Sequence, residues 1–267
     1  MPVSLITLTS DFGYADNFVG VMKGVILSIA PTARIVDLGH DITRGDIRHG
    51  AFVLLSGSKY FPLGTLHVAV IDPGVGTERR IICVEAGGQL FLGPDNGLLS
   101  WVTAKQGRTR VIHVTRKELF LPQISLTFHG RDVFAPVAAH LARDMKPEDL
   151  GPVISDMQEL PFPEVRKQDG SLVGEIIYED RFGNLVSNIE QEALAGVDVK
   201  KVVVTAGQTT IRGLSRTYGS GREGQLLALV GSPGYLEIAV NEGLASEVTG
   251  LDIGDAVTVS FNLNGQG

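Results

Sequence analysis

The sequence predicts an α/β domain followed by a smaller, mainly antiparallel β domain. Three observations support this fold class. Short apolar runs alternate with helical patterns over the first 155 residues, as in α/β proteins. A polar stretch that contains Pro161 and Pro163 then interrupts the pattern, as linkers do. Beyond it, strand-like runs follow one another with turn signals between them and few helical patterns.

The N-terminal part begins with a predicted strand at residues 4–9 (SLITLT). A helix is predicted at residues 17–30, where apolar residues recur at helical spacing before Pro31. The β-branched run at residues 65–71 (TLHVAVI) is typical of a strand covered on both faces, as in a parallel sheet. The remaining elements predicted here are strands at residues 34–37, 80–85, 90–92 and 111–114, and helices at residues 46–60 and 133–143.

The C-terminal part is predicted to consist of strands joined by turns. We place the N-terminal domain at residues 1–155, a linker at residues 156–170 and the β domain at residues 171–267. The strands are predicted from the runs LVGEIIYED, KKVVVTAG, TTIRGL, QLLALVG, YLEIAV and AVTVSF.

The composition is that of a globular protein, with 43% hydrophobic and 20% charged residues. The formal net charge of −7 is uneven, because the first 155 residues carry +1 and the others −8. A nucleic-acid binder usually has a clustered basic face, so we expect neither nucleic acid nor an anionic membrane as a partner. The sequence has no apolar run of about 18 residues, so it predicts no transmembrane helix. The start, MPVSLITLTSDFG, does not resemble a secretory signal.

Cys83 is the only cysteine of the chain, which rules out an internal disulfide and fits a cytoplasmic location. It lies in the apolar run RRIICVEAG, so we expect a packed core thiol rather than a nucleophile. The sequence contains no HExxH, paired-cysteine or His-x-His motif. We therefore expect neither a metal site nor a cofactor.

Polar residues that follow strands are the first candidates for a site, because open α/β sheets bind ligands beyond the carboxyl ends of their strands. Asp11 and Asp16 follow the first predicted strand, and such carboxylates can bind a ribose diol or an ammonium group. For Asp16, spacing alone favours a helix N-cap, since it stands just before the helix at residues 17–30. Asp11 is harder to explain by a structural role.

A glycine-rich loop at residues 72–80 (DPGVGTERR) follows the third predicted strand. It matches neither a P-loop nor the GxGxxG pattern. Asp72 and Arg79 can converge on one point across this loop, or form a surface ion pair that contributes about 0–1 kcal/mol. Among the histidines, His129 precedes a predicted helix, His40 is ambiguous, and His113 is expected to be structural.

Two segments of the β domain combine residue types that are common in turns, residues 180–184 (DRFGN) and residues 231–235 (GSPGY). Hairpin turns explain both segments without a ligand. Composition and spacing alone therefore indicate an α/β enzyme with a site at the strand ends, and no particular reaction.

Six motifs taken together resemble one family, and they are TSDFG, DPGVGTERR, PDNGLL, TFHGRDVFAPVAAHLA, DRFGNLVSNI and GSPGYLEIAVN. They occur in the order found in the S-adenosyl-L-methionine (SAM) hydroxide adenosyltransferases, which are relatives of the fluorinating and chlorinating enzymes. The resemblance covers about residues 4–260. It implies a Rossmann-like α/β domain, a smaller C-terminal antiparallel β-barrel-like domain, and a homotrimer with active sites between the N-terminal domain of one subunit and the C-terminal domain of the next.

The resemblance also implies a hydrolase that cleaves SAM at C5′ with an activated water, giving adenosine and L-methionine. The family's water-activating triad matches Asp72, Arg79 and His129 here, although the adjacent Arg80 also fits the position of the arginine. The halogenating relatives have a tyrosine in place of Asp72 and an inserted loop before the PDNGLL motif. This chain has neither feature, which favours water over halide as the nucleophile.

A set of substrate-binding residues follows from the same resemblance: Asp11, Asp16, Phe128, Asp180, Phe182, Asn184, Tyr218 and Ser232. Asp11 would hold the ribose hydroxyls, whereas the other aspartates and the serine would hold the amino-acid end. The asparagine would contact the adenine edge, and Phe182 and Tyr218 would pack around the base. Where the halogenases have an arginine after this serine, the chain has Pro233, so one contact to the substrate carboxylate has no counterpart.

Three alternatives stay open at this point. A halogenase-like substitution with chloride would form a halogenated nucleoside. A non-catalytic protein would bind adenosine or SAM without turnover, although buried Asp, Arg and His side chains are costly to keep for binding alone. In a purely structural scaffold, the same loops would serve as caps and turns and bind no adenosyl ligand.

Overall fold

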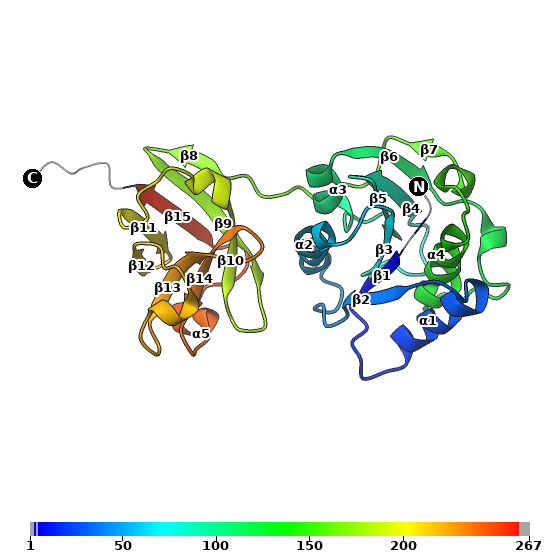
Figure 1. The fold of residues 1–267 in the computed structure, drawn as a ribbon, viewed down its shortest axis with the longest axis horizontal. Helices are drawn as coiled ribbons and strands as arrows, with labels where there is room; N and C mark the ends of the chain where they lie inside the picture. Colours follow the sequence, from blue (N-terminus) through cyan, green and yellow to red (C-terminus); the bar gives the residue numbers. More distant parts are fainter. Residues whose placement is uncertain (1–2, 4, 262–267) are drawn as a thin grey trace, which may run out of the picture. The chain divides into compact units, whose positions relative to one another are not determined.

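The computed structural model describes residue 3 and residues 5–261. The chain divides into two compact units, Met1–Pro161 and Phe162–Gly267 (Figure 1). Each unit has its own hydrophobic core, and each is described by itself here. No helix in the described part of the chain has the length and apolar character to cross a membrane.

Unit 1 is built on a seven-stranded sheet with the order β2-β1-β3-β5-β4-β6-β7. The first four strands in this order pair in parallel, and β4 and β6 add antiparallel pairs. Every residue of β3 is buried, as expected of a strand covered on both faces. The strands are β1 (Leu5–Ser10), β2 (Ile35–Gly39), β3 (Thr65–Val70), β4 (Ile81–Ala86), β5 (Gln89–Pro94), β6 (Arg108–His113) and β7 (Val153–Ile154).

Helices cover both faces of this sheet (Figure 1). Helices α1 and α4 share one core with Leu8 and Val68, and α2 and α3 share the other with Ile71 and Val84. Cys83 points into the first core, as predicted, and burial raises the pKa of its thiol to about 12. The helical segments are α1 (Phe18–Ile29), α2 (Ile47–Gly57), η1 (Ser58–Tyr60), α3 (Ser100–Gln106), η2 (Lys117–Leu119), η3 (Gly130–Phe134), α4 (Ala135–Ala142) and η4 (Pro147–Leu150).

The start of α1 corrects one prediction. Asn17, not Asp16, occupies the N-cap position, and no side chain caps the helix. The capping interpretation of Asp16 is therefore wrong. By contrast, Asp46 caps α2, because its Oδ1 accepts a hydrogen bond of 2.9 Å from the backbone N–H of His49.

Unit 2 is an antiparallel, barrel-like sheet with the order β12-β11-β15-β9-β10-β14-β13, and β8 pairs with β9. Its strands are β8 (Arg166–Gln168), β9 (Ser171–Glu179), β10 (Leu185–Glu190), β11 (Val202–Ala206), β12 (Thr209–Arg212), β13 (Leu226–Val230), β14 (Tyr235–Val240) and β15 (Ala256–Phe261). Three short helical segments join them: η5 (Gln191–Leu194), η6 (Tyr218–Ser220) and α5 (Ala245–Thr249). The predicted fold class, α/β followed by antiparallel β, is confirmed.

Candidate active site

The glycine-rich loop at residues 72–80 leaves the carboxyl end of β3 and folds back to the start of β4. The backbone N–H of Val75 donates to the carbonyl of Asp72 at 3.1 Å, which begins the turn. Gly76 has a φ of +79°, and a Cβ there would lie 2.3 Å from the carbonyl oxygen of Leu126. This close packing allows no side chain at position 76. The fold-back returns Arg79 to the side of Asp72.

Asp72 and Arg79 form a buried, forked ion pair. Arg79 Nε donates to Asp72 Oδ1 at 2.9 Å and to Oδ2 at 2.8 Å, and its Nη2 also contacts Oδ2. The side chains are only 9% and 5% exposed, so this is not the solvated surface pair considered from the sequence. The guanidinium also lies over the ring of Phe134, 5.6 Å from its centroid. Together these contacts fix the orientation of the carboxylate.

His129 extends the pair into a chain of three groups. Its Nδ1 lies 2.8 Å from Arg79 Nη2. Because a guanidinium can only donate, Nδ1 accepts this bond and the neutral ring carries its proton on Nε2. Burial, together with the nearby charge of Arg79, lowers the pKa of His129 below its usual 6.5. His129 is therefore neutral at neutral pH.

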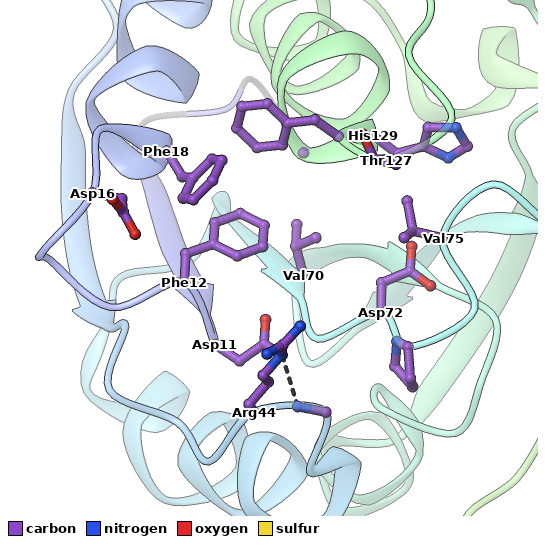
Figure 2. Close-up of a pocket in the computed structure, with 14 residues that line it drawn as sticks. Asp11, Phe12, Asp16, Phe18, Arg44, Val70, Asp72, Val75, Thr127 and His129 are labelled. Atoms are coloured by element: carbon purple, nitrogen blue, oxygen red, sulfur yellow. Dashed lines mark hydrogen bonds between the residues drawn. The ribbon is translucent and has the colours of Figure 1, made fainter.

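Asp72 and His129 line a cavity of about 800 Å³ at the carboxyl ends of the strands (Figure 2). Arg79 is not among the described residues that line it and instead links two that do. The lining comes from the ends of β1, β2 and β3 with the segments that follow them, the start of α1, and the segment that leads into η3. It comprises Asp11, Phe12, Asp16, Phe18, Arg44, Gly45, Val70, Asp72, Pro73, Val75, Thr127, Phe128, His129 and Gly130.

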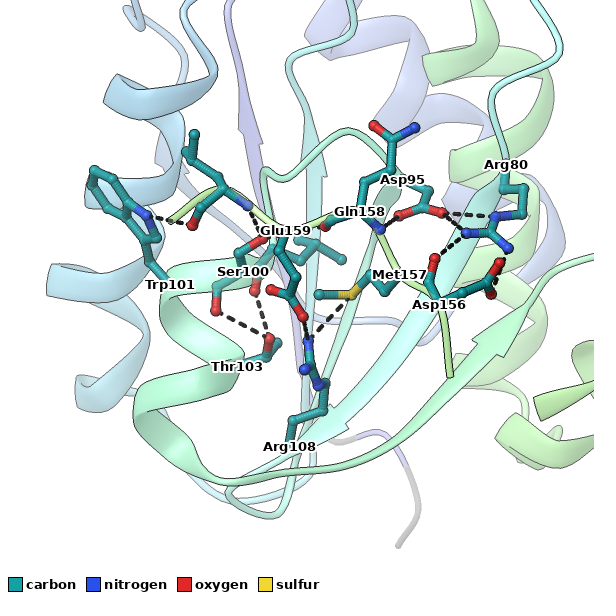
Figure 3. A network of polar contacts seen from close by, with 12 residues as sticks. Arg80, Asp95, Ser100, Trp101, Thr103, Arg108, Asp156, Met157, Gln158 and Glu159 are labelled. Atoms are coloured by element: carbon teal, nitrogen blue, oxygen red, sulfur yellow. Dashed lines mark hydrogen bonds and ion pairs between the residues drawn. The ribbon is translucent and has the colours of Figure 1, made fainter. Parts of the chain in front are cut away.

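Arg80 belongs to a different network (Figure 3). Its Nε donates to Asp95 Oδ2 at 2.7 Å, and its Nη1 donates to Asp156 Oδ1 at 2.8 Å. Asp95 Oδ1 in turn accepts from the backbone N–H of Gln158 at 2.7 Å. Arg80 thus ties the segment that ends unit 1 to the sheet, and Arg79 is the arginine that contacts Asp72 and His129.

The other predicted residues of unit 1 also reach the cavity. Asp11 Oδ2 accepts a hydrogen bond of 2.8 Å from the backbone N–H of Gly45, and Asp16 lines the cavity without acting as a cap. Phe128 packs against Phe18, with ring centroids 5.1 Å apart. The cavity wall therefore combines carboxylates with an aromatic face.

Arg44 and Gly130 line the cavity although sequence reasoning did not select them as site residues. Arg44 adds a cation to a wall whose other charged residues are Asp11, Asp16 and Asp72 (Figure 2). Arg44 follows β2 along the chain, and a search of all segments that follow the carboxyl ends of strands could have found it. Gly130 is tightly packed, because a Cβ there would lie 3.1 Å from Met22 Sδ.

In unit 2, Asp180 organises the turn between β9 and β10. Its Oδ1 accepts from the backbone N–H groups of Phe182 at 2.8 Å and Asn184 at 2.9 Å. Its Oδ2 accepts from Asn184 Nδ2 at 2.9 Å. The turn interpretation of this motif is confirmed, and the turn leaves the ring of Phe182 75% exposed.

Tyr218 contacts a buried acid that sequence reasoning missed. Its Oη donates to Glu237 Oε2 at 2.7 Å, and Glu237 is 3% exposed. Burial raises the pKa of this carboxyl group. Glu237 was missed because it stands in the apolar run YLEIAV, which reads as a plain strand. Ser232 lies exposed in the tight turn between β13 and β14, where Gly234 N–H donates to the carbonyl of Gly231 at 3.0 Å.

Within residues 3 and 5–261, no group of three or more His, Cys, Asp or Glu side chains is arranged to hold a metal ion. The cavity instead presents a carboxylate and a neutral imidazole joined by a guanidinium. This arrangement can accept a proton from a bound water and hold that water in place.

Comparison with known proteins identifies relatives over both units. The profile of the SAM hydroxide adenosyltransferase N-terminal domain matches residues 6–151, and that of the family's C-terminal domain matches residues 174–258. A Salinispora tropica protein named (R)-S-adenosyl-L-methionine hydrolase is 38% identical and aligns with 97% of this chain and 98% of its own. A Thermus thermophilus protein of the same name is 38% identical, with 92% and 95% covered.

A more distant relative is the fluorinase of an Actinoplanes species, which is 27% identical with 96% of this chain and 97% of its own covered. Among solved structures, an uncharacterized conserved protein from Thermotoga maritima superimposes with a TM-score of 0.90 at 35% identity. That match covers 96% of this chain and 100% of the other. With both units matched in order, this chain belongs to the SAM hydroxide adenosyltransferase family.

Proposed function

We propose that this chain is a hydrolase that cleaves SAM with water, giving adenosine and L-methionine. The observation that carries the proposal is the chain of contacts from Asp72 through Arg79 to His129 at the wall of the 800 Å³ cavity. The names of the relatives that are 38% identical support the same reaction. The more distant fluorinases make a halide ion the alternative nucleophile to water.

The substrate already contains a good leaving group, since its sulfur is a sulfonium. The oxygen of a water forms a bond to C5′ while the C5′–S bond breaks, and the electron pair of that bond stays on sulfur to give the neutral thioether of methionine. Asp72 accepts a proton from the water. Alignment of water and carbon in one site supplies up to about 7–11 kcal/mol in favourable intramolecular models.

Arg79 acts on the water indirectly, through Asp72, whereas His129 contacts the water directly. Arg79 keeps the Asp72 carboxylate in one orientation through its forked contact. The neutral His129, whose ring proton lies on Nε2, donates to the water oxygen and orients its lone pair toward C5′. Since Nδ1 is occupied by Arg79, the ring has one orientation available for this role.

The residues of unit 2 complete the substrate site as part of this proposal. Asp11 of unit 1 binds the ribose hydroxyls, and Asn184 of unit 2 contacts the adenine edge. The amino-acid end is bound by Asp16 of unit 1 together with Asp180 and Ser232 of unit 2. The family resemblance implies that unit 2 meets unit 1 of a neighbouring subunit, and the exposed Phe182 is free to contact a substrate held there. On the family resemblance we also propose a homotrimer with shared active sites, and sedimentation analysis tests its oligomeric state. We further propose that the enzyme is cytoplasmic and works without a cofactor.

The deciding experiment incubates the purified protein with SAM in oxygen-18 water and analyses the products by mass spectrometry. The two sulfonium epimers are assayed separately, because the relatives carry the name of the (R) epimer. Adenosine labelled at its 5′ oxygen, with unlabelled methionine, is the expected result. A 5′-halogenated nucleoside in added chloride would indicate the halogenase reaction, and binding without product would indicate an adenosyl-binding protein.

A further inference from the structure

We propose that a buried pair, Ser10 and His40, positions Asp11 and thereby sets the affinity of the site for the substrate ribose. The inference rests on the proposed function, in which Asp11 binds the ribose hydroxyls. Ser10 and His40 are each 1% exposed and do not line the cavity in the described part of the chain. They therefore act through Asp11 and do not touch the substrate.

The pair joins the carboxyl ends of two neighbouring parallel strands. Ser10 ends β1, His40 follows β2, and Ser10 Oγ lies 2.6 Å from His40 Nδ1. The backbone adds a second link, because Gly13 N–H donates to the carbonyl of His40 at 2.8 Å. Asp11 stands between these two links. Its carboxylate is held from the other side by the N–H of Gly45.

The positions of the protons on Ser10 and His40 follow from the groups around them. Burial lowers the pKa of His40, so the imidazole is neutral at neutral pH. Ser10 Oγ accepts from the backbone N–H of Phe12 at 3.3 Å and donates its own proton to Nδ1. The ring proton then lies on Nε2, which faces Asp37 Oδ1 at 3.3 Å without the alignment of a hydrogen bond.

Asp37 connects the pair to helix α1. Burial alone would raise the pKa of Asp37, but its contact with Lys23 outweighs burial and lowers the pKa. Lys23 Nζ lies 2.6 Å from Asp37 Oδ2, and the Tyr14 and His40 rings are nearly perpendicular with their centroids 5.2 Å apart. The imidazole is thus held on several sides, so that it gives Ser10 a fixed acceptor.

The same sheet contains a second buried hydroxyl–imidazole pair, Thr7 and His67, which serves as a control because neither residue lines the cavity in the described part of the chain. Thr7 Oγ1 lies 2.7 Å from His67 Nδ1, and both residues are 0% exposed. Thr7 is also on β1, three positions before Ser10, so its side chain points to the opposite face of the sheet. Loss of this bond removes a buried hydroxyl–imidazole contact without disturbing Asp11.

The test compares wild type, Ser10→Ala and Thr7→Val by calorimetric titration with adenosine and with 2′,3′-dideoxyadenosine, together with kcat and KM for SAM. We expect Ser10→Ala to weaken adenosine binding and raise KM by about two- to tenfold, the loss of one hydrogen bond. Binding of the dideoxy analogue, which lacks the ribose diol, and kcat stay the same. Thr7→Val leaves both affinities unchanged.

A double-mutant cycle adds a second readout. If Ser10 acts through Asp11, Ser10→Ala has little further effect on adenosine binding in an Asp11→Asn background. Equal weakening of both nucleosides, additive effects in the cycle, or unchanged adenosine binding would overturn the inference. A wild type that binds adenosine but releases none from SAM would reject the proposed function, whereas the nucleoside titrations would still decide the role of Ser10.

Discussion

Arg79 and Arg80 are consecutive residues whose guanidinium groups contact different carboxylates, Asp72 in the one case and Asp95 with Asp156 in the other. Arg79 closes the glycine-rich loop beside Asp72, whereas Arg80 directly precedes β4, which begins at Ile81, and faces the segment that ends unit 1. One arginine therefore supports the cavity wall, and the other fastens the end of unit 1.

Exchange of each arginine for lysine separates these two roles. Lysine cannot reproduce a forked contact, so Arg79→Lys is expected to lower kcat by about ten- to a hundredfold, the value of one hydrogen bond to a charged group. Arg80→Lys is the matched control, with kcat within about twofold of wild type and a lower melting temperature. Equal losses of kcat in both variants would argue against a special role for Arg79.

Asp72→Asn tests the proton acceptor. The amide keeps the shape of the carboxylate but cannot accept a proton, so we expect kcat to fall by about 10²–10⁴-fold while SAM still binds. Equilibrium dialysis with labelled SAM measures binding, and single-turnover assays measure the chemical step. Turnover at the wild-type rate would show that another group accepts the proton.

Phe182 tests whether the exposed turn of unit 2 contacts the substrate. Its ring is 75% exposed, so Phe182→Ala should change the free energy of unfolding by less than about 0.5 kcal/mol. In the proposed site the ring packs on the adenine base, and its loss should raise KM by about tenfold. Tyr60, an aromatic residue of unit 1 that is 71% exposed, is the control, and Tyr60→Ala should leave KM unchanged.

His67 predicts how stability depends on pH. Burial lowers its pKa from 6.5 to about 4. Between pH 4 and 6.5 this histidine is therefore protonated in the unfolded chain but neutral in the folded chain. Its contribution to stability is complete above pH 6.5 and is lost as the pH falls toward 4, by on the order of 3 kcal/mol.

Urea unfolding at several pH values measures this loss in wild type and in His67→Gln. The variant has no imidazole at this position, so its free energy of unfolding should fall less steeply between pH 6.5 and 4. Burial also lowers the pKa of His40, so part of the slope should persist in the variant. Identical slopes in the two proteins would assign the acid sensitivity to other groups.

The central strands and the position of the cavity could be predicted from the sequence. The run TLHVAVI was sufficient to predict β3, because a strand buried on both faces has an almost continuous apolar pattern. The link from Asp72 through Arg79 to His129 could not be derived by pattern alone, since Arg79 and His129 lie 50 positions apart and their contact depends on how the segment before η3 packs. The family resemblance supplied that pairing.

Three other features, β10, α3 and the start of α1, lack a local sequence pattern that would predict them. Strand β10 was missed because DRFGNLVSNI begins with turn residues that obscure the strand after them. Helix α3 is only seven residues long, too short for a clear periodicity. The prediction that Asp16 caps the helix failed because a helix can begin without any side-chain cap, as α1 does.

Gly130 leaves little free space beside His129. A Cβ there would lie 3.1 Å from Met22 Sδ, 3.1 Å from the Phe128 ring and 3.2 Å from the Phe12 ring. A serine or any larger residue at position 130 therefore requires these three side chains, which come from separate segments, to shift together by a few tenths of an ångström. A new hydroxyl donor can thus enter the wall beside His129 only with a rearrangement of the aromatic face of the cavity.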